Sequence, residues 1–235
     1  MMSDSETKQP QQNQGFLGNL AFNIVIPVVI MSYASSEDYL GPAWSIVAAL
    51  AFPLGYGFWD LKQSGKINMF SILGIVSVLL TGGISLLKLP ASYIAIKEAA
   101  IPALIGLAVL ITQFTSKPLV KLLILNDQII NWAHLNDVLD AKGKRHAFER
   151  KVAISSYIVA GSFFLSSALN YILAKVILVS EPGTTAYTEE LGRMTALSYP
   201  VIVIPSMILL VTALWYLFTQ IKKITGEELD NFINH

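Results

Sequence analysis

The sequence predicts an all-α, polytopic membrane protein with six transmembrane helices. Three observations predict this class, and the first two are compositional: of 235 residues, 54% are hydrophobic and only 14% are charged. Soluble globular proteins carry about 25% charged residues, so this chain lacks the polar surface that it would need in water. The third is a set of six long apolar stretches, since a helix needs about 20 such residues to cross a bilayer. They cover residues 17–34, 41–59, 67–87, 91–114, 152–179 and 195–219.

The distribution of positive charges predicts the orientation, because cytoplasmic segments of membrane proteins are enriched in Lys and Arg. With the amino terminus in the cytoplasm, 12 of the 16 Lys and Arg residues lie inside, and two, Lys88 and Arg193, lie outside. We therefore expect both termini to be cytoplasmic. Residues 1–14 are predicted to be a disordered polar tail, residues 15–223 the membrane domain and residues 224–235 a cytoplasmic tail.

The composition excludes several classes of function. Equal numbers of basic and acidic residues, 16 of each, argue against nucleic acid as a partner. The chain has no Cys, which excludes disulfides, thiolate metal ligands and a Cys nucleophile. It also lacks the motifs of serine hydrolases, zinc proteases and phosphate-binding loops. The nearest approach to a metal cluster is His134 with Asp127 or Asp137, so we expect no enzyme, metal or cofactor.

The predicted cytoplasmic connection between the fourth and fifth spans contains an amphipathic segment at residues 119–140. Apolar residues recur there at steps of three and four, as in a helix with one apolar face. They are Leu122, Leu125, Ile129, Trp132, Leu135 and Leu139. Such a helix can lie on the inner leaflet, with Lys142, Lys144 and Arg145 contacting anionic lipid headgroups. It can also pack beneath the bundle as a structural support, and the two roles are compatible.

Two adjacent ionisable residues, Lys97 and Glu98, lie in the fourth span. A charge in hydrocarbon costs about 2.5–3.5 kcal/mol, so such residues are the first candidates for function. Helix neighbours point about 100° apart, so we expect each to find a partner on another helix or in water. Pro102 removes the helical donor of the Glu98 carbonyl. The predicted ligand or anion pocket comprises Lys97, Glu98, Pro102 and Asn170; the alternative is that Lys97 extends to the outer interface.

Polar and small residues form faces on several spans. The polar faces comprise Asn19 and Asn23 in the first span, and Ser155, Ser162, Ser166 and Asn170 in the fifth. Such faces usually join helices, with about 0.6 kcal/mol per hydrogen bond; lining a transport path is the rarer use. Gly82 and Gly83 are interpreted as points of close helix packing.

Ile-Pro pairs recur near the middle of three spans, at Ile26-Pro27, Ile101-Pro102 and Ile204-Pro205. The first and fourth spans are three apart and are expected to run in opposite directions. That arrangement is what an inverted repeat of three plus three helices requires.

Several short motifs occur along the chain in a fixed order: Ile26-Pro27-Val28-Val29, the run from Thr81 to Leu87, Tyr93-Ile94 with Lys97, Lys117-Pro118-Leu119 and Ala168-Leu169-Asn170. In this collinear order they resemble the intracellular septation protein A family of bacterial inner-membrane proteins. The resemblance marks Gly82, Gly83, Lys97, Lys117, Pro118 and Asn170 as family-like positions. Glu98 stands where the family tends to have proline, and the cytoplasmic loop is longer and more basic, so the chain resembles a divergent relative.

The resemblance implies a multi-pass protein of the bacterial inner membrane that takes part in cell-envelope maintenance or division, a family role without an agreed chemical activity. We therefore expect a non-enzymatic protein whose partners are membrane lipids and other envelope or division membrane proteins. The alternative is a small transporter or lipid-handling protein that uses the pocket around Lys97 and Glu98. Because six spans are few for a transporter, that alternative requires a homodimer.

Overall fold

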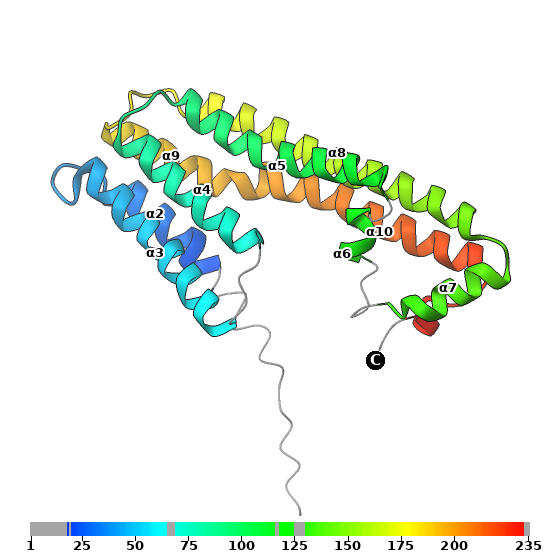
Figure 1. Ribbon diagram of the computed structural model, residues 1–235. Helices are drawn as coiled ribbons and strands as arrows, with labels where there is room; N and C mark the ends of the chain where they lie inside the picture. Colours follow the sequence, from blue (N-terminus) through cyan, green and yellow to red (C-terminus); the bar gives the residue numbers. More distant parts are fainter. Residues whose placement is uncertain (1–17, 19, 65–68, 116–117, 125–129, 233–235) are drawn as a thin grey trace, which may run out of the picture. The chain divides into compact units, whose positions relative to one another are not determined.

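The computed structural model describes residues 18, 20–64, 69–115, 118–124 and 130–232. These residues form helices and the turns between them, without a β-strand (Figure 1). The predicted tail at residues 1–14, and Asn19, Lys117, Leu125, Asp127 and Ile129, lie outside the described residues. The all-α prediction is confirmed for the described part of the chain.

Four helical segments are long and apolar enough to cross a membrane. They are Gly41–Trp59, Ser92–Gln113, Arg145–Ile177 and Thr185–Thr225. Two shorter apolar helices, Ala21–Tyr33 and Ile72–Leu86, match the remaining predicted spans. The chain is therefore a helical membrane protein by the length and hydropathy of its helices.

The chain divides into two compact units. Unit 1 comprises Met1–Ile94 and Ala174–Leu197, and unit 2 comprises Ala95–Leu173 and Ser198–His235. Unit 1 holds η1 (Ala21–Val25), α2 (Ile26–Tyr33), α3 (Gly41–Ser64), α4 (Met69–Leu86) and nearly all of α9 (Thr185–Ser198). Unit 2 holds most of α5 (Ser92–Gln113) and α8 (Arg145–Ile177), with α6 (Leu119–Ile124), α7 (Trp132–Ala141), η2 (Tyr199–Val203), α10 (Ile204–Thr225) and η3 (Leu229–Phe232).

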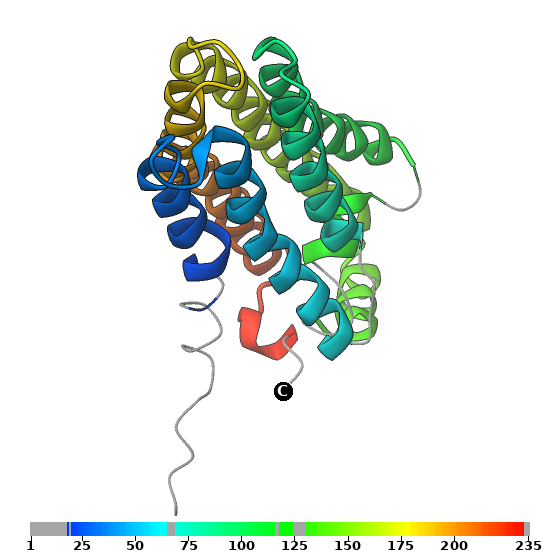
Figure 2. The same cartoon turned by 90° about the vertical axis from the view of Figure 1, so that its left-hand side faces the viewer.

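In unit 1, α2, α3 and α4 lie side by side, as both views show (Figures 1 and 2). Close packing depends on small residues. A Cβ on Gly82 would stand 2.9 Å from the Leu50 Cδ1 atom of α3, whereas a Cβ on Gly83 would meet nothing within 4 Å. The packing interpretation therefore fits Gly82, and Gly83 faces open space. The helices α9 and α2 also approach closely, because a Cβ on Gly192 of α9 would lie 3.0 Å from the Cβ of Met31 and 3.5 Å from the Val28 carbonyl oxygen.

The last helical segment begins earlier than the predicted 195–219 span. Helical conformation runs without a break from Thr185 to Thr225. The hydroxyl of Thr184 accepts a hydrogen bond from the Tyr187 backbone N–H at 3.2 Å, which satisfies one of the free donors of the first turn. The predicted span lies within this helix, whose polar first half precedes the apolar stretch that predicts the span.

Two of the three Ile-Pro pairs follow a π-helical turn. The N–H of Ile26 donates to the carbonyl of Ala21, and the N–H of Ile204 donates to the carbonyl of Tyr199. A proline ring collides with the carbonyl four residues earlier, and a widened turn relieves that collision. Pro102, in contrast, lies inside the α-helix α5. The backbone conformation at the Ile-Pro pair is therefore alike in the first and last predicted spans. An inverted repeat requires the likeness between the first and fourth spans.

In unit 2, the predicted amphipathic segment forms two helices, α6 and α7, instead of one. The apolar face of α7 is covered by protein, since Leu135 and Leu139 are 0% and 1% exposed. They belong to one core with Phe148 of α8, Leu217 of α10 and Phe232 of η3. The backbone N–H of Asn131 donates to the carbonyl of Phe232 at 2.7 Å, which joins this region to the end of the chain. The structural-support interpretation of α7 therefore accounts for its apolar face.

The helix contact at Gly192 yields a prediction with an internal control. In helices that face open space, Gly→Ala gains about 1 kcal/mol of helix propensity. We expect Gly83→Ala to keep or raise the thermal unfolding midpoint. Gly192→Ala should lower it, because the new methyl group would stand 3.0 Å from the Met31 Cβ. Thermal unfolding of the two purified variants in the same detergent measures this, and equal midpoints would contradict the packing.

Candidate functional site

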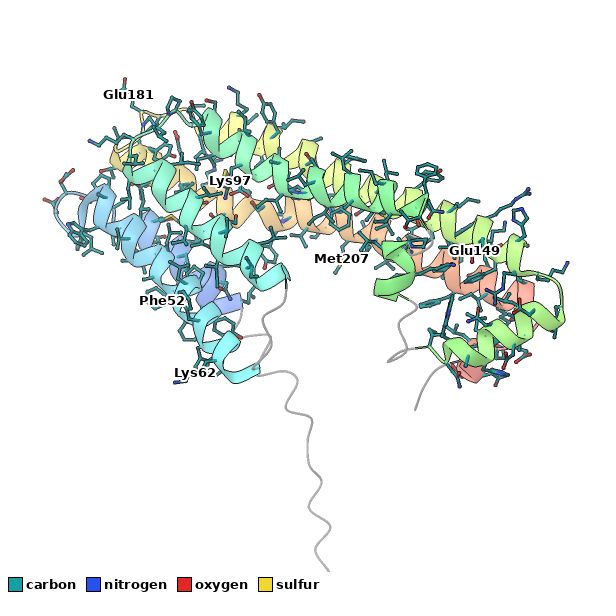
Figure 3. The ribbon with its side chains drawn as sticks, in the orientation of Figure 1. Phe52, Lys62, Lys97, Glu149, Glu181 and Met207 are labelled. Atoms are coloured by element: carbon teal, nitrogen blue, oxygen red, sulfur yellow. The ribbon has the colours of Figure 1, made fainter. Side chains whose placement is uncertain are left out.

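The charged residues of α5 pair with each other. Lys97 Nζ lies 2.6 Å from Glu98 Oε1, and the two side chains are 7% and 26% exposed. Lys97 is labelled in Figure 3. The prediction that helix neighbours would not pair was wrong. Both side chains are long enough for their charged ends to converge despite the 100° between their Cβ directions, and a low-dielectric surrounding strengthens the attraction. Lys97 is thus buried beside an acid of its own helix.

The carbonyls near Pro102 receive a donor from α8. The hydroxyl of Ser167 donates to the Ala99 carbonyl at 2.8 Å. Close helix approach permits this, since a Cβ on Gly106 would lie 3.2 Å from the Cβ of Phe163. Ser167 was not among the predicted residues, although it neighbours the predicted serine face. The Ala99 carbonyl, one turn before Pro102, therefore has a hydrogen-bond donor from the packed helix α8.

The predicted polar face of α8 mainly joins helices. Ser155 Oγ donates to the Ala213 carbonyl at 3.1 Å, and Ser162 Oγ donates to the Ser206 carbonyl at 2.7 Å, both across to α10. Asn170 Nδ2 donates to the Ser166 carbonyl of its own helix at 2.8 Å. The amide of Asn170 is thus engaged within α8.

Asn23, on η1, also takes part in a polar or ring interaction.

Two of the three cations predicted to contact lipid headgroups, Lys142 and Arg145, have protein partners. Lys142 Nζ donates to the carbonyl of Thr225, the last residue of α10, where a cation favours the helix dipole. Arg145 donates to Asp140 at 2.6 and 2.8 Å and to Asn136 at 3.1 Å. The hydrogen bond from Arg145 lowers the pKa of Asp140 below its ordinary value. Lys144 is exposed.

The α6–α7 region also contains a polar cluster that the sequence did not single out. Lys121 Nζ lies 2.5 Å from Glu149 Oε1 and within 6 Å of the ring centroids of Trp132 and Phe148. His134 Nε2 lies 3.5 Å from Glu227 Oε2. Asp137 does not join it in a metal-binding group, and no cluster of three His, Asp or Glu ligands occurs among the described residues. These contacts fix α7 against α8 and the end of α10.

Two cavities lie in unit 1. An apolar cavity of about 520 Å³ lies along η1 and α3 and is lined by Gly18, Phe22, Ala51, Phe52, Gly55, Tyr56 and Trp59. A mixed polar cavity of about 280 Å³ lies where the loops preceding α3 and α9 meet the end of α4. Lys97, Glu98, Pro102 and Asn170 line neither of these two cavities.

Comparison with known proteins adds no relative. The chain matches no family model, no curated protein and no solved structure.

The buried pair on α5 yields a prediction about stability. Removing one partner of a buried ion pair typically costs about 3 kcal/mol, because a charge is left uncompensated. We expect Glu98→Gln to lower the free energy of unfolding by about that amount. Lys97→Met should cost less, because Glu98 is the more exposed partner. The double variant Lys97→Met with Glu98→Leu should cost less than the two single changes added together.

A double-mutant cycle in mixed detergent micelles measures this coupling. The matched control is the exposed pair of Lys222 and Glu228, whose side chains are 56% and 69% exposed. Glu228→Gln should change stability by less than about 1 kcal/mol. Equal effects of Glu98→Gln and Glu228→Gln would show that the α5 pair has no special protein environment.

Proposed function

We propose that this chain is a non-enzymatic, multi-pass protein of the bacterial inner membrane that maintains the cell envelope or assists division through lipids and membrane partners. The observation that carries the proposal is the large number of bulky apolar side chains exposed on spanning helices. Examples are Leu104 at 65%, Ile111 at 64%, Val176 at 66% and Trp215 at 69% exposed. Apolar surface of this kind requires lipid or protein to cover it.

Two further observations support a role in binding rather than in chemistry at the spans. The charge on Lys97 is answered by its helix neighbour, and the serines of α8 satisfy carbonyls of the adjacent helices. Such closed contacts stabilise a bundle. The compartment and the process come from the resemblance to the septation protein A family, which the motifs around Gly82, Lys97 and Asn170 carry.

A small dimeric transporter or lipid-handling protein is the second candidate. The observation that favours it is the apolar cavity between η1 and α3. Its volume, about 520 Å³, lies within the range of about 300–1,000 Å³ typical of ligand sites. Its aromatic walls, where Phe22 and Tyr56 stack with centroids 6.0 Å apart, suit an acyl chain. In this candidate a lipid acyl chain binds in the apolar cavity, which Lys97 does not line.

We also propose six crossings with both termini in the cytoplasm. The chain has no Cys, so single-cysteine variants report position without background. In intact cells, a membrane-impermeant maleimide should label Asp38→Cys and Glu181→Cys. Lys62→Cys and Lys144→Cys should react only after the membrane is permeabilised. Labelling of Lys144→Cys in intact cells would reverse the assigned orientation.

Deletion of the gene, followed by complementation, tests the function. We expect the deletion strain to become sensitive to detergent and to divide abnormally, and the wild-type chain to restore both properties. The Lys97→Met, Glu98→Leu double variant should restore them too, provided that its membrane level equals that of the wild type. If Lys97→Ala alone abolishes function at unchanged level and thermal stability, transport or lipid handling by the α5 residues is the better account. An unaltered deletion strain would contradict the envelope role.

A further inference from the structure

The mixed polar cavity of unit 1 is lined by two opposite charges. Its walls include Glu37 from the loop before α3, Trp44 of α3, Ser85 and Lys88 from the end of α4, and Gly183 from the loop before α9. Although the structure describes both charged side chains, it records no ion pair between Glu37 and Lys88, or between either and a third described residue. The cavity therefore offers a carboxylate and an ammonium that are not neutralised by each other.

The backbone of Lys88 is held in a conformation that lysine rarely adopts. Its φ is 53°, and it is the sole non-glycine residue with positive φ in the part of the chain that the structure describes. The N–H of Lys88 donates to the Ser85 carbonyl at 3.1 Å, and the N–H of Leu89 donates to the Ile84 carbonyl at 3.0 Å. These two bonds form the helix-ending motif that usually has glycine at this position. A strained residue kept at a cavity is a reason to look for a function of its side chain.

A second loop is shaped around the Lys88 side chain. Gly183 has a φ of 89°, and a Cβ there would stand 2.6 Å from Lys88 Cε and 2.9 Å from Lys88 Cδ. The aliphatic stem of Lys88 therefore lies against Gly183. Any side chain at position 183 would displace that stem. The loop is fixed in turn by Glu190, whose carboxylate accepts hydrogen bonds from the N–H groups of Val179 and Ser180 at 3.0 and 2.9 Å. The aliphatic stem of Lys88 thus lies against this loop.

The carboxylate of Glu37 lies beside the first residue of α3. Its Oε2 lies 3.5 Å from the Cβ position of Gly41, the first residue of α3, where the helix dipole favours a negative charge. Trp44, one turn further along α3, is 69% exposed. An indole face and a carboxylate together are a favourable environment for an ammonium group.

We propose that this cavity binds a small zwitterion, in which an ammonium group and an anionic oxygen group are joined by a short linker. The anionic group pairs with Lys88, and the ammonium group lies between Glu37 and Trp44. The volume of about 280 Å³ admits a headgroup or an amino acid but not a bulky ligand. Two sources have this chemistry: the ethanolamine phosphate headgroup of a lipid and a free amino acid. The proposal does not depend on the envelope role, since it needs only that the cavity be open to the aqueous phase.

Titration of the full chain in a neutral maltoside detergent, followed by ligand-detected NMR, tests the site. The probes are glycerophosphoethanolamine and glycine, with ethanolamine and the phosphodiester glycerophosphoglycerol as single-charge controls. We expect at least one zwitterion to bind on the order of tenfold more tightly than either control, as one charge-assisted contact requires. Binding of glycerophosphoethanolamine alone indicates a lipid headgroup, and binding of glycine indicates a free solute. Equal binding of a single-charge control, or no binding of either zwitterion, overturns the proposal.

Variants separate binding from folding. Lys88→Gln and Glu37→Gln should each weaken zwitterion binding on the order of tenfold. The matched controls Lys175→Gln and Glu181→Gln remove exposed charges that do not line the cavity and should leave binding unchanged. Lys88→Gly removes the ammonium group and relieves the positive φ, so it should weaken binding on the order of tenfold without lowering the unfolding midpoint. Undiminished binding by Lys88→Gly or by Lys88→Gln would show that the lysine serves only the fold.

Discussion

Polar groups inside apolar helices have no water to bind, and this constraint organises the structure. Most find a partner within the chain, because an unsatisfied group in hydrocarbon costs several kcal/mol. Among the described buried side chains, the exceptions are Ser35 Oγ, Gln113 Oε1 and Ser206 Oγ. On α5 and α8 the partners are close at hand: Lys97 reaches Glu98, and Ser167, Ser155 and Ser162 reach carbonyls of neighbouring helices. The glycines follow from the same constraint, because these short side chains reach a carbonyl only where small residues let backbones approach. Gly106 beside Phe163 is such a place.

The charged side chains discussed in the two units differ in whether they have partners within the protein. In unit 2, the charges around α7 are closed on the protein: Lys121 on Glu149, Arg145 on Asp140, and Lys142 on the last carbonyl of α10. They hold α7 over an apolar core. In unit 1, Glu37 and Lys88 line the same cavity, and the described residues form no ion pair with either of them. A cation at the end of α10 stabilises a helix end, whereas a lysine in a strained turn beside a cavity is better explained by a ligand.

The fold was predictable in class and the candidate site only in part. Hydropathy found the helices, and the steps of three and four predicted the buried face of α7 at Leu135 and Leu139. Helix geometry was insufficient for Lys97 and Glu98, because Cβ directions do not limit where long side chains end. From the sequence, Lys88 was predicted only to be one of the two cations outside the membrane. The run Leu-Lys-Leu-Pro after an apolar stretch is nevertheless typical of a helix end. Gly183 and Glu190 gave no sequence signal at all.

The sequence by itself determined the membrane class, the approximate positions of the apolar helices and the charge asymmetry, because these depend on composition and local periodicity. Only the tertiary structure decided which groups meet. Tyr187 and Ser85 lie 3.4 Å apart although they are distant in the chain, and Gly183 supports Lys88 across a similar separation. Such contacts depend on how loops of different length return to the same place, which no local pattern specifies. The polar cavity belongs to this second kind of information, since three separate segments must meet to form it.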